Sequence, residues 1–189
     1  MNDTMVMKWD ELTILRSSAS DILADYRKSH DRKAVDRWCD YMEFVLCLIY
    51  DYGWKDAEQI VGIVPFKDGL DDICVNLEIE GETYRGRIVH QLDEDSLAGI
   101  LRIIDTEAHR DYNTGVYDAG RQSGVPGLKK MWWTQMDNRV RDAHQYLNGV
   151  KVGIDDYFYT DTGERTLFPG GFGVPELDCN CRCFVTLSR

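Results

Sequence analysis

Apolar residues near the amino end recur at three- and four-residue steps in two successive stretches, residues 9–28 and residues 33–52. This spacing gives one apolar stripe on each stretch and predicts two amphipathic helices. The link between them is short and polar, so we expect an αα-hairpin. Gly53 follows the second stripe and is predicted to end its helix as a C′ glycine, with a third, shorter helix over residues 54–62.

The middle of the chain is less regular until a long helical period begins at Asp95. Apolar and polar residues alternate over 74–79, which favours a short strand, and residues 84–91 favour a helix. From Asp95 to Gln122 the apolar residues keep a helical period, with Asp95 or Ser96 as the expected N-cap. This segment is the clearest element of the chain.

The chain changes character after a Gly- and Pro-rich break at residues 123–127. Short strands are predicted over 130–134, 150–154 and 184–187, with one short helix over 137–147. The prediction is therefore an α+β fold. Its helical N-terminal half, an αα-hairpin plus a long helix, is followed by a small C-terminal α+β unit with short antiparallel strands.

Composition narrows the function classes. The 189 residues, 43% of them hydrophobic, fit one folded domain or one domain with a small appendage, and we divide the chain at 1–94 and 95–189. With 33 Asp+Glu against 22 Lys+Arg the net charge is -11, which disfavours direct nucleic-acid binding because phosphate contacts need clustered cations. No apolar run approaches the length of a membrane span, so we expect no membrane partner.

Three of the six cysteines, Cys179, Cys181 and Cys183, are crowded together near the carboxyl end. No secretory signal is visible, so we expect the thiols to be made in a reducing cytosol. Alternate side chains of an extended segment share a face, and thiolates bind Zn²⁺, which needs about four ligands in a structural site. His144 is the obvious fourth candidate. Three interpretations stay open: reduced packing thiols, a zinc site or a disulfide.

His144 also belongs to a second group, since Asp137, Arg141 and His144 stand at i, i+4 and i+7. On a helix this spacing places all three along one face. His144 is then either a base or ligand oriented by a carboxylate, or part of a structural network in which Asp137 pairs with Arg141. A nucleophilic pair of His144 with Cys181 or Cys183 is a further alternative, without a nucleophile elbow or cysteine-protease signature.

The acidic residues of the back half lack the regular spacing of an EF-hand loop, so they predict a solvated face. They are Asp155, Asp156, Asp161, Glu164, Glu176 and Asp178. Trp132 and Trp133 are predicted to anchor a core or an interface. The Gly-rich residues 169–173 predict a rigid irregular loop.

Several short motifs occur in a fixed order over roughly residues 95–187. They are Asp105-Thr106-Glu107, Asn113, Trp133-Thr134, Asp137-Asn138-Arg139-Val140-Arg141-Asp142-Ala143-His144, Leu147-x-Gly149, Asp156-x-Phe158, Pro169-Gly170, Glu176 and Asn180-Cys181-Arg182-Cys183. Each motif alone is a weak signal, whereas the ordered set is specific. The set resembles the phage Mu protein F-like family, the head morphogenesis or minor capsid proteins of tailed phages and prophages.

The resemblance implies a non-catalytic minor head protein that acts in head morphogenesis by docking to portal and/or capsid proteins. It implies synthesis in the bacterial host cytoplasm and a location in the virion head or procapsid. In some phages this domain is fused to toxin or transferase domains. The alternative is a Cys/His or metal-dependent hydrolase that uses His144 with Cys181 and Cys183.

We expect the motif residues to hold the fold together. Arg139, Arg141 and His144 would tie the short helix to the loops that carry Asp156 and Pro169. The strand with the last two cysteines would close the fold, with or without zinc.

Overall fold

The computed structural model describes residues 10–65 and 81–189, and it confirms the α+β class with a helical N-terminal half. The helices of that half are α1 (Asp10–Ser29), α2 (Arg32–Val61), α4 (Tyr84–Asp93) and α5 (Leu97–Gln122). The helices predicted over 9–28, 84–91 and 95–122 are thereby confirmed. The strand predicted over 74–79, together with Cys74, lies outside the described residues.

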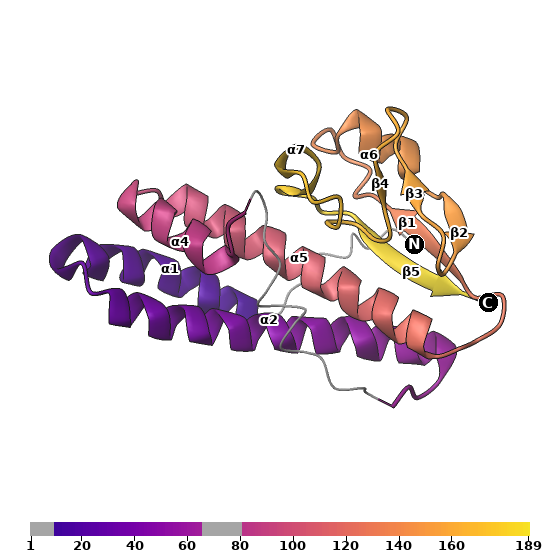
Figure 1. Ribbon diagram of the computed structural model, residues 1–189, viewed down its shortest axis with the longest axis horizontal. Helices are drawn as coiled ribbons and strands as arrows, with labels where there is room; N and C mark the ends of the chain where they lie inside the picture. The colour runs from indigo at the N-terminus through magenta and orange to yellow at the C-terminus, as the bar shows by residue number, and fades with distance from the viewer. Residues whose placement is uncertain (1–9, 66–80) are drawn as a thin grey trace.

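The first two helices form the predicted αα-hairpin (Figure 1). Asp31 lies between them and caps α2, because its side chain accepts a hydrogen bond from the backbone N–H of Lys33. Across the hairpin the indole N–H of Trp38 donates to the Ser18 hydroxyl at 2.8 Å. The apolar stripes of both helices are buried, as their periodicity predicts.

The predicted end of the second helix at Gly53 is wrong, and so is the separate helix over 54–62. α2 continues through Gly53 and ends before Gly62, whose φ of 91° favours glycine. A Cβ atom at Gly53 would overlap the carbonyl oxygen of Tyr112, and one at Gly115 would overlap that of Tyr50. The two glycines therefore allow the backbones of α2 and α5 to pack in direct contact.

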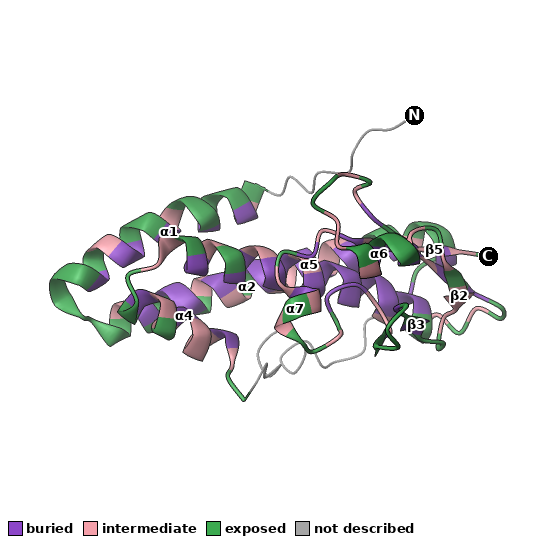
Figure 2. Cartoon of the chain, turned by 90° about the horizontal axis from the view of Figure 1, so that it is seen from above, coloured by how far each residue is buried: buried purple, intermediate pink, exposed green. Residues whose placement is uncertain are grey.

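Helix α5 is the central element of the molecule. It lies between α2 on one side and strand β5 (Phe184–Ser188) on the other (Figure 1). Ser96 caps it by accepting from the backbone N–H of Gly99. Most of its length is buried, while the outer face of α1 is exposed (Figure 2). α5 therefore serves both halves of the fold, and one hydrophobic core runs through them.

The C-terminal unit contains the predicted short antiparallel strands. β1 (Lys129–Trp133) lies between β2 (Lys151–Gly153) and β5 in a three-stranded sheet, and Trp132 is opposite Val185. The remaining elements are a hairpin of β3 (Phe158–Tyr159) and β4 (Arg165–Thr166) and two short helices, α6 (Asp142–Leu147) and α7 (Pro175–Asp178). Trp132, Val185 and Leu187 are buried.

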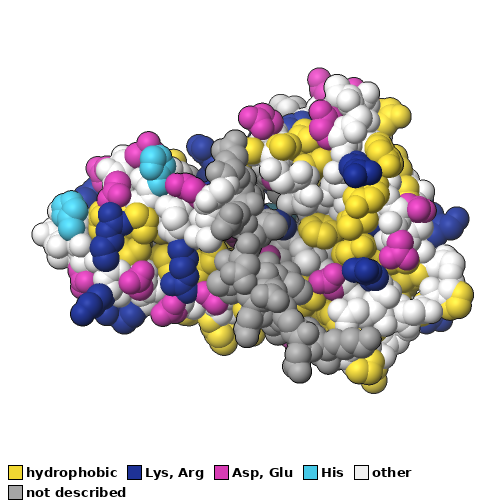
Figure 3. All heavy atoms as spheres, in the orientation of Figure 1, with side chains coloured by type: hydrophobic (Ala, Val, Ile, Leu, Met, Phe, Trp, Pro, Cys, Tyr) yellow, Lys and Arg dark blue, Asp and Glu magenta, His cyan; other side chains and the backbone are white. Residues whose placement is uncertain are grey.

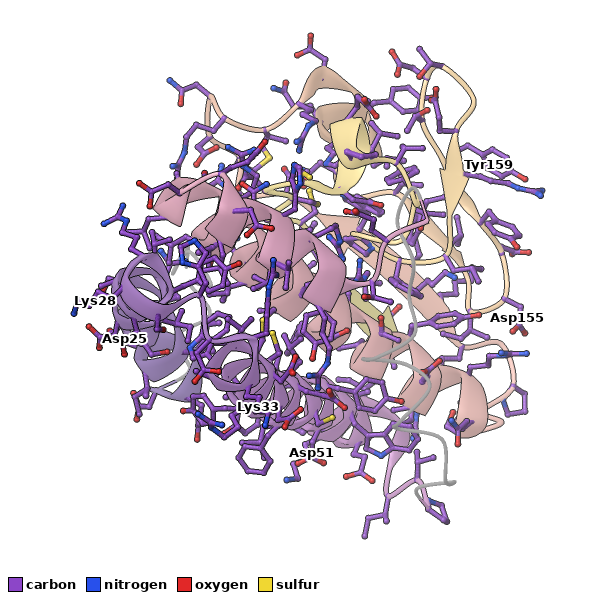
Figure 4. All side chains as sticks on the ribbon, turned by 60° about the vertical axis from the view of Figure 1, so that its left-hand side comes forward. Asp25, Lys28, Lys33, Asp51, Asp155 and Tyr159 are labelled. Carbon is purple, nitrogen blue, oxygen red and sulfur yellow. The ribbon has the colours of Figure 1, made fainter. Side chains whose placement is uncertain are left out.

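The two ends of the molecule differ in their surfaces. Charged side chains of both signs alternate over the helical end, whereas hydrophobic side chains gather over the C-terminal unit (Figure 3). Asp25 and Lys28 lie together near the hairpin turn, far from Asp155 and Tyr159 on the C-terminal unit (Figure 4). Within the described residues, none of the helices has the length and apolar character needed to cross a membrane.

Candidate metal centre

The structure brings His144, Cys181 and Cys183 together in the interior of the C-terminal unit. The imidazole Nδ1 of His144 lies 3.5 Å from the Sγ of Cys183 and 3.7 Å from the Sγ of Cys181. One donor atom from each residue falls within 4.8 Å of the other two. The three residues are 1%, 4% and 2% exposed, so bulk water has little access to the cluster.

Local backbone geometry brings the thiols to the histidine. α6 carries His144, and the chain reverses after α7 at Asn180, whose φ is 54°. Asparagine tolerates this left-handed region better than most residues. The backbone N–H of Asn180 also donates to the Thr106 hydroxyl of α5 at 3.2 Å. The last two cysteines then follow on the segment that leads into β5.

Aromatic rings form the wall around the histidine. The Phe172 ring stacks on His144 with centroids 5.8 Å apart, and Trp132 meets His144 edge-on at 5.6 Å. Phe158, which is fully buried, packs edge-on against Trp132 at 5.2 Å. These contacts fix the ring orientation and exclude water. The motif residue Phe158 therefore supports the cluster from behind.

The two buried thiols are electrostatically coupled. A hydrogen bond to Cys183, together with burial, raises the pKa of the Cys181 thiol well above its usual value. The same hydrogen bond lowers the pKa of Cys183, because it stabilises the thiolate. The Cys183 thiol is therefore the more acidic of the two.

The predicted helical face of Asp137, Arg141 and His144 is wrong, because α6 begins only at Asp142. Asp137 lies in the preceding turn, where its carboxylate accepts from the backbone N–H of Arg139 at 3.0 Å. Its principal partner is Arg182, which donates two hydrogen bonds at 2.6 and 2.8 Å. These bonds lower the pKa of Asp137 to about 2. The carboxylate therefore anchors the cysteine segment and does not orient His144.

The expected tie from the short helix to the Pro169 loop is made by His144, whose ring stacks on Phe172, whereas the expected ties through Arg139 and Arg141 are wrong. Arg139 is exposed, and its Nε lies 3.7 Å from the carboxylate of Asp137. Arg141 donates to the backbone carbonyl of Cys179, and His144 faces the thiols. Arg141 and Arg182 thus both fasten the cysteine segment.

Asn113 of α5 connects the Pro169 loop to the segment that carries Cys183 and Val185. Its amide nitrogen donates to the carbonyl oxygens of Pro169 at 3.2 Å and of Cys183 at 3.1 Å. Its amide oxygen accepts from the backbone N–H of Val185 at 3.0 Å. One fully buried side chain therefore satisfies three backbone groups of two separate segments.

Buried charges occupy the adjacent turn of α5. Glu107, which is 0% exposed, accepts from Arg87 of α4 at 2.9 Å and pairs with Arg110 on its own helix. Gly170, with φ 87°, lies against the backbone of Arg110, so a side chain there would be crowded. The motif residues Glu107 and Gly170 thus serve the packing of α4 and of the Pro169 loop on α5.

Asp178 does not belong to a solvated acidic face, contrary to the sequence prediction. It is 1% exposed, and its carboxylate accepts from the backbone N–H groups of Phe172 and Gly173 at 3.2 and 2.7 Å. Burial raises its pKa, and these bonds oppose the shift. The other members of that set, Asp155, Asp156, Asp161, Glu164 and Glu176, are exposed.

The remaining motif residues shape turns. Gly149 follows α6 with φ 78°, and its N–H donates to the Trp132 carbonyl at 2.8 Å. Asp156 accepts from the backbone N–H of Gly153 at 3.1 Å.

Lys130 is a buried residue that the sequence analysis missed: its ammonium donates to the Ile154 carbonyl at 2.7 Å. Its place on a short strand gave no signal that it would be buried.

Cys179 is separate from the cluster. It borders a cavity of about 420 Å³ that is also lined by Arg87, Thr106 and Asp178. A cavity of about 10 Å³ adjoins the cluster itself and is lined by His144, both clustered cysteines and neighbouring arginines. That volume is the space of one water molecule. The sequence suggests four metal ligands, and the structure places one of them, Cys179, outside the cluster.

These features describe a small unit that is closed by buried polar groups and packed on a long helix. The family model of Phage Mu protein F like protein matches residues 79–186, more than half of the chain. The protein therefore belongs to this family. The matched region contains α4, α5 and the whole of the candidate metal centre.

Two curated relatives are each similar to a little over half of the chain. Minor head protein GP7 of Bacillus phage SPP1 is 31% identical over 105 residues, which are 55% of this chain and 34% of that protein. NAD(+)–arginine ADP-ribosyltransferase EFV of Enterococcus faecalis strain V583 is 35% identical over 109 residues, 55% of this chain and 22% of that protein. The chain thus spans about a third and a fifth of their lengths. No solved structure matches it.

Proposed function

We propose that this protein is a minor head protein of a phage or prophage. In this proposal it acts in head morphogenesis by docking to portal and/or capsid proteins, without catalysis. The family and the similarity to the SPP1 minor head protein support this role. Synthesis in the host cytoplasm and a final place in the virion head or procapsid are part of the same proposal.

The observation that carries the non-catalytic part is the closure of the histidine–cysteine cluster. All three residues are buried, and the adjoining cavity of about 10 Å³ has the volume of one water molecule. A hydrolase needs its nucleophile and base within reach of a bound substrate. A metal at this cluster would act as a cross-link and not as a centre for turnover.

Charge supports a protein partner over a nucleic acid. A net charge of -11 repels a polyanion and favours association with a basic protein surface. The C-terminal unit also exposes large apolar side chains, which are common at protein interfaces. They are Trp133, Met136, Tyr146, Tyr157, Tyr159 and Val174.

Co-expression with the portal and major capsid proteins encoded in the same phage genome tests the proposal. We expect the protein to co-sediment with procapsids or to elute with the portal in size-exclusion chromatography. Its absence from both fractions, with all three proteins soluble, would contradict docking.

Two histidine variants separate the structural role from the hydrolase alternative. His144→Ala should lower the melting temperature and the incorporation into procapsids together, because it removes the centre of the cluster. His90→Ala is the matched control, since His90 is exposed and pairs with Glu94, and it should change neither. A His144→Ala protein that melts like wild type but has lost a measurable hydrolytic turnover would support the alternative.

A further inference from the structure

We propose that the Nδ1 of His144 and the Sγ atoms of Cys181 and Cys183 bind one zinc ion, with a single water as the fourth ligand. The ion cross-links α6 to the segment that leads into β5. This inference goes beyond the role in head morphogenesis and does not depend on it.

The spacing of the donor atoms fits the ion. Zinc binds thiolate sulfur at about 2.3 Å and imidazole nitrogen at about 2.0–2.1 Å in tetrahedral geometry. These bond lengths place sulfur and nitrogen ligands about 3.6 Å apart. The two sulfur–nitrogen distances in the structure are 3.5 and 3.7 Å. An ion can therefore be placed between the donors without moving α6 or the cysteine segment.

Hydrogen bonding alone does not account for the convergence of two thiols on one nitrogen. A ring nitrogen offers either one lone pair or one N–H in the plane of the imidazole. It can therefore make one good hydrogen bond, yet both sulfurs lie within contact of the same Nδ1. A metal ion between the three atoms satisfies all of them at once.

The charge and softness of the donor set select zinc. Two thiolates neutralise a divalent ion, so the buried site carries no net charge and avoids a large desolvation penalty. Thiolate and imidazole ligands in tetrahedral geometry are typical of zinc, whereas calcium and magnesium take oxygen ligands. Binding releases the two thiol protons to solvent, and His144 coordinates through the lone pair of Nδ1.

The fourth position belongs to water. The cavity beside the cluster is lined by His144, Cys181 and Cys183, and its volume of about 10 Å³ is enough for one water molecule. Cys179 is excluded as a ligand because it borders the other cavity, near Arg87. This exclusion makes Cys179 the natural control for its two neighbours.

Metal analysis of the reduced, purified protein tests the proposal. Wild type and Cys179→Ser should each contain about one zinc per chain, whereas Cys181→Ser and Cys183→Ser should fall below about a tenth. A zinc chelator should lower the melting temperature of wild type and of Cys179→Ser but leave Cys183→Ser unchanged. Loss of zinc in Cys179→Ser alone, or a folded wild type with less than about a tenth of an equivalent, would overturn the assignment.

Cobalt substitution of the wild-type chain gives a test that needs no variant to fold. Bound Co²⁺ should show the strong visible bands of a tetrahedral site and a thiolate charge-transfer band of two-sulfur intensity. A pale octahedral spectrum would contradict the ligand set. Protein purified without reductant gives a second contradicting outcome. A mass lower by two hydrogens, together with no uptake of metal, would indicate a disulfide in place of the zinc site.

Discussion

The helical hairpin and the C-terminal unit are stabilised by different means. α1 and α2 pack through apolar stripes, and the ion pairs of α1, such as Arg27 with Asp95, lie on the surface. The C-terminal unit instead buries polar side chains of its own, such as Lys130 and Asp178, and is held to α5 by the buried amide of Asn113. Aliphatic packing tolerates exchanges of similar volume, whereas a buried hydrogen-bonding group has few substitutes. The comparison predicts that equal-sized substitutions act very differently in the two regions.

The largest effect should come from Asn113→Leu. The change keeps the number and branching of the side-chain heavy atoms but leaves the Val185 N–H and the Pro169 and Cys183 carbonyls buried without their partner. Unsatisfied buried groups cost about 1–3 kcal/mol each, so we expect a loss of about 4 kcal/mol in the free energy of unfolding. Urea denaturation measures it. Asn138→Leu, at an exposed position, should stay within about 0.5 kcal/mol of wild type; equal effects would break the comparison.

A change of nearly the same size is expected on the helical side from Gly115→Ala. In an open helix this exchange stabilises by about 1 kcal/mol, but here the added carbon meets the Tyr50 carbonyl. We expect a loss of about 3 kcal/mol from the forced separation of α2 and α5. Gly86→Ala is the matched control, because its Cβ would lie 3.7 Å from the nearest atom and should stabilise. Stabilisation in both variants would refute the close helix contact.

The buried ammonium of Lys130 should make the free energy of unfolding depend on pH in the alkaline range. Burial lowers its pKa to about 8, against about 10.4 in an unfolded chain. Between these values the unfolded state binds more protons, so wild-type stability should rise with pH across that window, by at most about 3 kcal/mol. The free energy of unfolding of Lys130→Met should not rise with pH. The stability of this variant relative to wild type should therefore be highest near neutral pH. Parallel pH profiles of the two proteins in urea denaturation would contradict a buried ammonium.

The smallest effect concerns the partly exposed pair of Asp137 and Arg182. The pKa of Asp137 is lowered to about 2, so its contribution is present above the unfolded value near 3.9 and is lost as the pH falls towards 2. Asp137→Asn should lower the melting temperature at neutral pH, and the difference from wild type should vanish in acid. Asp161→Asn is the exposed control. A difference that persists at about pH 2 would exclude the ion pair as its cause.

The sequence predicted what depends on local periodicity. The stripes of α1, α2 and α5 are local signals, so these helices were predicted. Gly53 was misinterpreted because a glycine that ends a helix and one that admits a neighbouring backbone look the same in the chain. What distinguishes them is Tyr112, far away in sequence.

The site was predicted in composition but not in geometry. The crowding of Cys181 and Cys183 and the presence of His144 indicated a cluster, and the structure brings these three together. The exclusion of Cys179 depends on the backbone reversal at Asn180, which spacing does not encode. The burial of Asp178 likewise depends on the path of a loop and not on residue type.

The shared use of α5 also affects how the chain is made. During translation α1 and α2 leave the ribosome first, and the apolar side of α2 that belongs against α5 has no cover until residues 97–122 emerge. The C-terminal unit then needs the opposite side of the same helix. The core is therefore completed late in synthesis, and a nascent chain stalled before α5 presents an apolar face that chaperones bind.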